Sequence, residues 1–366
     1  MESALGSVHD VGCGQVPAER VPLKRSLSSA GKQGWAIAAA RTPRATARAC
    51  PLSAAARGRG AGGSVVLSVI AFALAALGGA SRAWSDATVL PWQSLAGQHA
   101  TCSGPRHKSF AAQMTEVEVD LGQGLKTTSW TFNGTVPGPT FEVCEGDTVT
   151  LTVTNKGSMA HGLDSHAFQI DARKFGPIEP GKTLTITAPV RVPGVFMYHC
   201  AAGEMTDQHI KMGMAGVMIV YPRSTPLPPA KELVVMRNGV YGAPGANGVI
   251  APETNAMDRN APTFFIFNGS LAHDPIAVRK GQRVRVYFVN AGPGVASFHV
   301  IGTILDAARL SGNAKNTLWG VQTVEVGAGN GASIDFTIPE AGTFLLVDHD
   351  QLAHLPEGFV IPFKSE

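Results

Sequence analysis

The feature that most constrains the fold is an internal repeat of two 24-residue segments that begin 135 positions apart. Phe132–Asn155 aligns without a gap to Phe267–Asn290, and both begin with Phe-Asn-Gly, contain a turn glycine and end in an alternating strand. The later segments Gly194–His199 and Gly342–His349 also resemble each other. Because this spacing far exceeds the period of solenoid repeats, it indicates a duplicated domain, with the Pro-rich stretch after Tyr221 as the connection.

Apolar and polar residues alternate within both copies. The pattern is clearest in Glu116–Leu121 and Thr148–Thr154, and a period of two is typical of half-buried strands. Charged residues make up only 16% of the chain, while Gly 42 and Pro 24 are plentiful, which favours turn-rich β structure. We therefore predict an all-β protein with antiparallel sheets, in two tandem β-sandwich domains at 86–222 and 223–366.

The first 85 residues differ from the rest and are predicted to lie outside the fold. Residues 1–64 lack apolar periodicity, and the apolar run that follows, with its small-residue end, occupies 65–83. The run is shorter than the ~20 apolar residues of a membrane span and has the order of a secretory signal. We expect a leader and an exported, periplasmic protein, with an uncleaved membrane anchor as the alternative.

The net charge of +3 comes from this leader. Residues 1–85 hold 10 Lys+Arg and 3 Asp+Glu, so the remainder has 20 basic and 24 acidic residues, a net charge of −4. No basic patch of the kind that binds nucleic acid is visible in the remainder, and we expect no nucleic-acid partner.

Three cysteines follow the leader: Cys102, Cys144 and Cys200. An odd number leaves at least one thiol unpaired in an exported protein, and metal binding is one use for it. Cys102 and Cys144 could form a disulfide or stay as two separate buried thiols, and the sequence leaves both open.

Metal-ligand side chains cluster between positions 161 and 214. They are His161, His166, His199, Cys200, His209 and Met214. Soft and borderline metals, copper above all, select imidazole, thiolate and thioether ligands, and a blue-copper centre uses two His, one Cys and a weak axial Met. Cys200, His209 and Met214 with His161 would complete such a set, although Met205 or Met212 could replace Met214. His166 and His199 remain for a second metal.

These motifs resemble those of the copper-containing nitrite reductases, two-domain cupredoxin enzymes with Greek-key sandwiches. The resemblance covers about residues 115–363. Its carriers are Ala160–His166, Tyr198–Cys200, His209, Met214, Ser297–Gly302 and Leu346–His349.

The resemblance implies a function and a role for each residue. It implies reduction of nitrite to nitric oxide by two coppers per chain, with the electron passing through His199-Cys200. It also implies a homotrimer that receives electrons from a small blue-copper protein or a cytochrome c. The type 1 copper ligands would be His161, Cys200, His209 and Met214. The type 2 ligands would be His166, His199 and His349, with His349 reaching across from a neighbouring subunit. Asp164 and His299 would flank the substrate, and Ile301 would lie over it.

Elementary chemistry supports these roles. Three neutral imidazoles leave an open coordination position, as in catalytic metal sites. Asp164 precedes His166 by two residues, so on a strand both side chains would lie on one face.

Other interpretations remain open. Asp164 could be a turn carboxylate and His299 a core histidine, while His354 or His273 could replace His349. A two-domain laccase-like oxidase is one alternative function, although the chain lacks the paired His-x-His motifs of that class. A blue-copper electron carrier with a vestigial second site is the other. Gln208, Lys211 and Met212 also differ from the residues usual in the family.

Overall fold

The computed structural model describes residues 102–103 and 106–366. The predicted leader 1–85, with its apolar segment 65–83, lies outside the described residues. Among the described residues, no helix is both long enough and apolar enough to cross a membrane.

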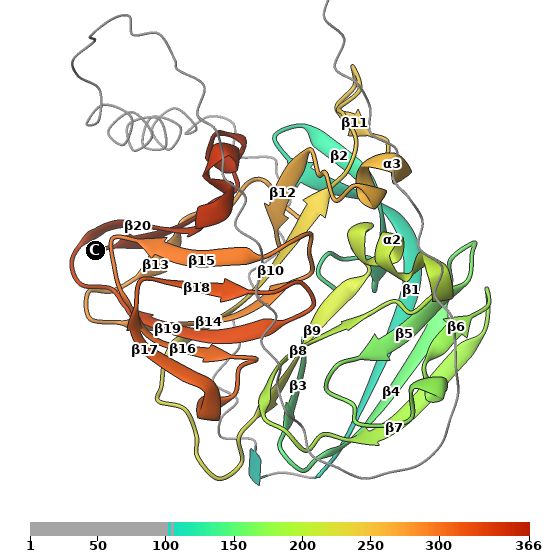
Figure 1. The fold of residues 1–366 in the computed structure, drawn as a ribbon, viewed down its shortest axis with the longest axis horizontal. Coiled ribbons are helices and arrows are strands. Elements are labelled where there is room, and N and C mark those ends of the chain that lie inside the picture. The colour runs from blue at the N-terminus through green and yellow to red at the C-terminus, as the bar shows by residue number, and fades with distance from the viewer. Residues whose placement is uncertain (1–101, 104–105) are drawn as a thin grey trace, which may run out of the picture. The chain divides into compact units, whose positions relative to one another are not determined.

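Residues 107–221 form two facing sheets (Figure 1). A short strand from further along the chain, β11, is added at the edge of the first sheet. The first sheet has the order β11-β2-β1-β4-β7, with bounds β1 His107–Gly122, β2 Leu125–Phe132, β4 Thr148–Asn155, β7 Thr183–Pro189 and β11 Val249–Ile250. The second has the order β3-β9-β8-β5-β6, with bounds β3 Phe141–Cys144, β5 His161–Ser165, β6 Gly176–Ile178, β8 Gly194–His199 and β9 Ala215–Tyr221.

The core of this first sandwich follows from strand alternation. Every second residue of β4 is buried, and these residues, such as Val149 and Leu151, belong to one core with Tyr198 of β8 and Met218 of β9. Two short helical segments, η3 Gly203–Met205 and α2 Thr206–Lys211, follow β8 and precede β9. A further short segment, η2 Ala172–Lys174, precedes β6.

Residues 231–365 form a second pair of sheets. One has the order β12-β10-β14-β19-β16-β17, with bounds β10 Lys231–Val240, β12 Phe264–Phe267, β14 Arg283–Asn290, β16 Leu305–Leu310, β17 Thr317–Val321 and β19 Gly331–Thr337. The other has the order β13-β21-β20-β15-β18, with bounds β13 Ile276–Val278, β15 Ala296–Ile301, β18 Thr323–Val326, β20 Gly342–Asp348 and β21 Ile361–Ser365. The helical segments within residues 231–365 are α3 Thr254–Asp258, η4 Ala314–Asn316 and η5 His349–Glu357.

The two sandwiches reproduce each other's topology, so the predicted all-β class with two tandem sandwiches is confirmed. The order β2-β1-β4-β7 of the first corresponds to β12-β10-β14-β19 of the second. The repeated Phe-Asn-Gly forms the same turn in each copy, because Asn133 and Asn268 both have positive φ, of 59° and 47°. In both copies the Asn side-chain oxygen accepts a hydrogen bond from a backbone N–H, of Gln113 and of Met236 respectively. The predicted boundary at 222/223 falls between β9 and β10.

The prediction of antiparallel sheets is wrong for several strand pairs. β1 runs parallel to β4, β3 to β9, β10 to β14 and β13 to β21, so the sheets are mixed. Parallel neighbours need a crossover connection, which a hairpin turn cannot provide. Here the chain crosses to the opposite sheet between the paired strands, and local alternation does not reveal such a crossing.

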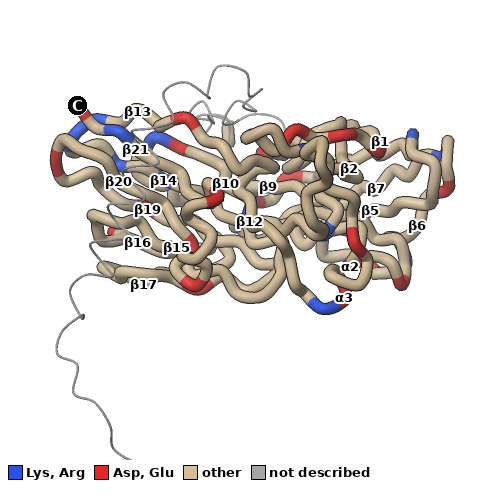
Figure 2. Tube along the Cα trace, turned by 90° about the horizontal axis from the view of Figure 1, so that it is seen from above, with Lys and Arg blue, Asp and Glu red and all other residues tan. Residues whose placement is uncertain are grey.

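The sandwiches pack against each other through apolar side chains. Met197 of β8 and Val217 of β9 share a buried cluster with Val234 and Met236 of β10 and Val289 of β14. Consequently β10 and β14 are almost continuously buried. Figure 2 shows the few charged residues scattered among predominantly uncharged ones.

The described cysteines settle the disulfide alternative. Cys102 and Cys144 are bonded to each other, with their Cα atoms 5.5 Å apart, and Cys200 is the free, buried cysteine of the described part of the chain.

Candidate metal centres

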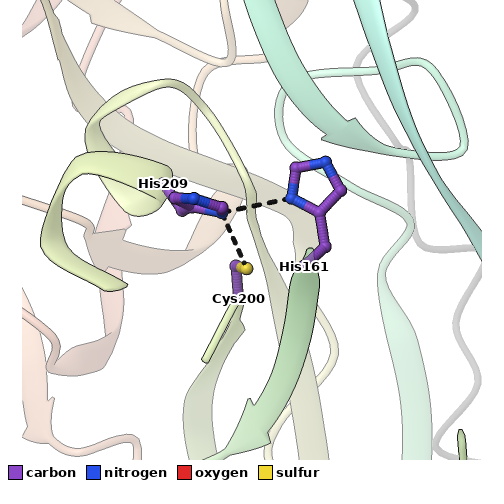
Figure 3. A group of neighbouring side chains, drawn as sticks. All are labelled: His161, Cys200 and His209. Carbon is purple, nitrogen blue, oxygen red and sulfur yellow. Dashed lines mark hydrogen bonds between the residues drawn. The ribbon is translucent and has the colours of Figure 1, made fainter. Parts of the chain in front are cut away.

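Three of the predicted type 1 ligands converge in the first sandwich (Figure 3). His161 begins β5, Cys200 directly follows β8, and His209 lies in α2. The Nδ1 atoms of His161 and His209 are 3.1 Å apart, and Cys200 Sγ is 3.1 Å from His209 Nδ1. All three residues are buried, so this structure brings two imidazoles and one thiol to a single point away from water.

The protonation of this group suits a soft or borderline metal. Burial lowers the pKa of His209 to about 4, and burial also lowers the pKa of His161 although Glu116 opposes it. Both rings are therefore neutral near pH 7. Burial raises the pKa of the Cys200 thiol to about 12, against the backbone N–H groups of Gly162, Ala201 and Ala202, which lower it. A metal cation at Sγ would deprotonate the thiol, so the donor set fits copper.

Gly162 permits the close approach that builds this site. A Cβ atom at this position would lie 2.2 Å from the carbonyl oxygen of Ala201. The Gly162 N–H donates to Cys200 Sγ at 3.1 Å. Only a residue without a side chain lets β5 lie so near the segment that carries Cys200.

The methionine alternatives differ in their surroundings. Met214 is fully buried in the same core as Cys200, and its backbone C=O accepts a hydrogen bond from the Cys200 N–H at 3.1 Å. Met205 is 41% exposed, and Met212 packs in a separate cluster with Tyr241. This arrangement favours Met214 as the axial ligand.

Two residues that the sequence analysis did not single out also contact the imidazoles. The Trp130 ring lies 4.3 Å from the His209 ring and 5.8 Å from the His161 ring, between centroids. Glu116 Oε1 lies 3.5 Å from His161 Nε2. No sequence signal marks either residue, since each occupies an ordinary position on an alternating strand.

A second group of possible ligands lies next to the first. It contains Asp164, His166 and His199, whose ligand atoms lie within 4.8 Å of one another. The Nε2 atoms of His166 and His199 are 3.0 Å apart, and Asp164 Oδ2 is 3.7 Å from His199 Nε2. Asp164 and His199 are register partners across β5 and β8. The structure therefore brings the predicted carboxylate to the predicted imidazole pair.

Hydrogen bonding identifies the ligand nitrogen of His199. Its Nδ1 lies 2.7 Å from the Cys200 carbonyl oxygen, which can only accept. Nδ1 must therefore carry the proton, and Nε2 is left as the donor atom toward the metal. Burial lowers the pKa of His199, so the ring is neutral near pH 7. His166 is exposed, so this second group is open on one side.

The remaining predicted residues gather on the second sandwich. The rings of His299 and His349 meet edge to face, with centroids 5.6 Å apart. His299 and Ile301 are two residues apart on β15, so their side chains share a face. His299 Nδ1 donates to the Gln322 carbonyl oxygen at 2.6 Å. His349 is exposed and belongs to neither ligand group found among the described residues of this chain.

His273 and His354, the alternatives to His349, are less exposed than His349. His273 is buried, with 3% of its surface exposed. His354 Nδ1 lies 2.6 Å from Glu357, and its ring packs on Phe265. Of these three histidines, His349 is the one that is exposed and lies beside His299, so it is the best placed to bind a metal outside its own sandwich.

The unusual residues Gln208 and Lys211 of α2, and Met212 directly after it, attach this helix to α3. Gln208 Nε2 donates to Asp258 at 3.3 Å, and the buried Lys211 ammonium donates to the Met257 carbonyl at 2.7 Å. Met212 packs on Met257 in the same cluster. These residues therefore hold the helix that carries His209 against a segment from the second half of the chain.

Comparisons with known proteins agree with this architecture. A multicopper oxidase family model matches residues 113–225. The copper-containing nitrite reductase of Neisseria gonorrhoeae is 32% identical over 265 residues, which cover 69% of this chain and 67% of that protein. The solved copper nitrite reductase of Nitrosomonas europaea has a TM-score of 0.63 at 35% identity, covering 70% of this chain and 94% of that one. The solved copper nitrite reductase of Thermus scotoductus SA-01 has a TM-score of 0.65 at 28% identity, covering 71% and 62%. The chain therefore belongs to the family of copper-containing nitrite reductases.

Proposed function

We propose that this chain reduces nitrite to nitric oxide and that it holds two coppers, one in each ligand group. The observation that carries this proposal is the adjacency of Cys200 and His199, since one belongs to the first ligand group and the other to the second. Bound copper would supply a one-electron donor at the first group and an open, nitrite-binding position at the second. The Cys200–His199 peptide link gives the electron a short covalent path between them.

Proton delivery would fall to Asp164, which lies in the second group, and to His299 of a neighbouring copy's second sandwich. Nitrite, one electron and two protons give nitric oxide and water. Asp164 lies 3.7 Å from His199 Nε2, close enough to hold a proton beside a bound anion. His299, with its Nδ1 proton fixed on a carbonyl, presents a half-buried imidazole as the second proton carrier.

We further propose that the second group is completed by His349 of a neighbouring copy in a homotrimer. His166 and His199 supply only two imidazoles, and His166 is exposed. His349 is also exposed, and it stands next to His299, the predicted substrate-flanking residue. Docking of one chain's second sandwich onto another's first would bring Asp164, His299 and Ile301 to one site.

We also propose an exported, periplasmic protein that receives electrons from a small blue-copper protein or a cytochrome c. The Cys102–Cys144 disulfide supports the location, because such bonds persist in oxidising compartments. Cell fractionation, with reduction of the type 1 absorption by candidate donors, would check both points.

The test uses His166→Ala and His349→Ala in the copper-loaded protein, with His354→Ala as a control from the same segment, η5. Both site variants should lose nitric oxide release from nitrite and keep the visible absorption of the Cys200–copper bond. The control should keep both. One copper per wild-type chain, or oxygen uptake without nitric oxide release, would contradict the proposal and favour the carrier or the oxidase.

A complementation experiment tests the shared site. Mixing unfolded His166→Ala and His349→Ala chains and refolding them together should restore part of the activity, because some interfaces would pair an intact His166 with an intact His349. Absence of any recovery, with trimers formed, would place all three ligands in one chain.

A further inference from the structure

Glu116 lies behind the first ligand group, on the side of His161 away from the thiol. Its Oε1 is 3.5 Å from His161 Nε2, the imidazole is completely buried, and the carboxylate is 25% exposed. Ser158 holds this carboxylate in place, donating its backbone N–H to Oε1 and its hydroxyl to Oε2, both at 2.8 Å. An acidic side chain is thus held beside Nε2 of His161, a predicted copper ligand.

The orientation of His161 gives that carboxylate a specific role. Nδ1 faces His209 and the thiol, so Nδ1 is the atom that would bind the metal. A neutral imidazole that binds metal through Nδ1 carries its proton on Nε2. His161 Nε2 is buried and has no partner within normal hydrogen-bond geometry, and Glu116 is the acidic group paired with it. A buried N–H without an acceptor is costly, so a small closure of this gap is favourable.

A glycine at position 157 leaves the space between the Glu116 carboxylate and the His161 ring free. A Cβ atom at Gly157 would lie 2.8 Å from Glu116 Oε1 and 2.9 Å from His161 Nε2. Gly157 itself is fixed by donating its N–H to Asn155 Oδ1 at 2.8 Å. Any larger residue in this turn would wedge the carboxylate away from the ring.

We propose that Glu116 is a positioning residue for the type 1 centre, accepting the Nε2 proton of His161. This inference rests on the proposed function, because it requires copper at the first ligand group. A carboxylate behind a ligand imidazole fixes the ring and its tautomer and makes the metal-binding nitrogen a stronger donor. A stronger donor favours the oxidised over the reduced metal, so Glu116 lowers the reduction potential of the centre.

The same strand provides a matched control. Glu118 lies two residues further along β1, carries the same charge and is 54% exposed. Its partner is Lys126, at 3.0 Å, and not a ligand. Glu118→Gln therefore removes an identical charge from the same strand without touching His161.

The experiment measures the reduction potential of the copper-loaded protein from the visible absorption of the Cys200–copper bond. Loss of such a partner typically changes metal affinity 10–100-fold. If Glu116→Gln weakens copper binding only in the oxidised state, a tenfold loss of that affinity raises the reduction potential by about 59 mV for a one-electron couple. Gly157→Ala should shift it in the same direction, and it serves as the second variant if Glu116→Gln does not bind copper. Glu118→Gln should match the wild type.

The outcomes separate this inference from the proposed function. If the potentials of Glu116→Gln and Gly157→Ala equal that of Glu118→Gln, the role of Glu116 is refuted while the copper assignment stands. If the wild-type protein shows no Cys200–copper absorption after copper loading, the proposed function itself fails.

Discussion

The strongest stability prediction concerns the ion pair that precedes His349. Asp348 Oδ2 lies 2.7 Å from Arg237 Nε, and the two side chains are 1% and 0% exposed. Asp348 Oδ1 also accepts the backbone N–H groups of Ser297 at 2.9 Å and Asp350 at 3.2 Å. Replacing Asp348 by Ala would leave the Arg237 guanidinium buried without its counter-charge, which typically costs about 3–5 kcal/mol.

This prediction is checked by urea unfolding followed by circular dichroism. The free energy of unfolding should fall by about 3–5 kcal/mol in Asp348→Ala, but by less than about 0.5 kcal/mol in the exposed neighbour Asp350→Ala. The double variant Arg237→Met with Asp348→Leu should recover part of the loss, since no charge stays buried. A loss below about 1 kcal/mol in Asp348→Ala, or a double variant no more stable than the single one, would refute the reasoning.

Three further predictions address the rest of the chain. Gly162→Ala should lower the free energy of unfolding by about 1–3 kcal/mol and weaken the Cys200–copper absorption, because its Cβ would lie 2.2 Å from the Ala201 carbonyl; an unchanged spectrum would contradict this. Replacing both disulfide cysteines, 42 residues apart, by Ser should reduce the free energy of unfolding in urea by roughly 4 kcal/mol and leave that absorption intact. Burial lowers the pKa of His273 to about 4, whereas an unfolded histidine titrates near 6.5. The unfolded state therefore takes up this proton first, and the unfolding free energy of the copper-free chain should decline as the pH falls from about 6.5 to about 4. His273→Gln should flatten that decline.

Much of the fold could be predicted from the sequence, because strand alternation and turn chemistry act locally. The alternating residues of Thr148–Asn155 determine which side of the strand is buried, whatever strand lies next to it. The Asn-Gly turns at 133–134 and 268–269 adopt similar positive φ angles in both copies, because few other residue pairs tolerate such angles. The parallel pairing of β1 with β4 could not be predicted in this way, since it depends on a chain crossing between sheets.

The ligand chemistry was also a property of the sequence alone. Residue type decides which atoms can bind copper, and the covalent neighbours His199 and Cys200 must lie close together in any fold. Their spacing to His209 and the upstream position of His161 then sufficed to predict the group that the structure assembles.

The tertiary structure alone decided which of several equivalent residues lie at the site. Glu116 and Glu118 are indistinguishable in an alternating strand, yet Glu116 lies beside His161, because the turn that contains Ser158 holds its carboxylate there, whereas Glu118 pairs with Lys126. His349 is distinguished from His354 by exposure and by its contact with His299, which depend on the packing of β15 against η5. Local sequence fixes chemistry and periodicity, whereas contacts between distant segments arise only when the whole chain has packed.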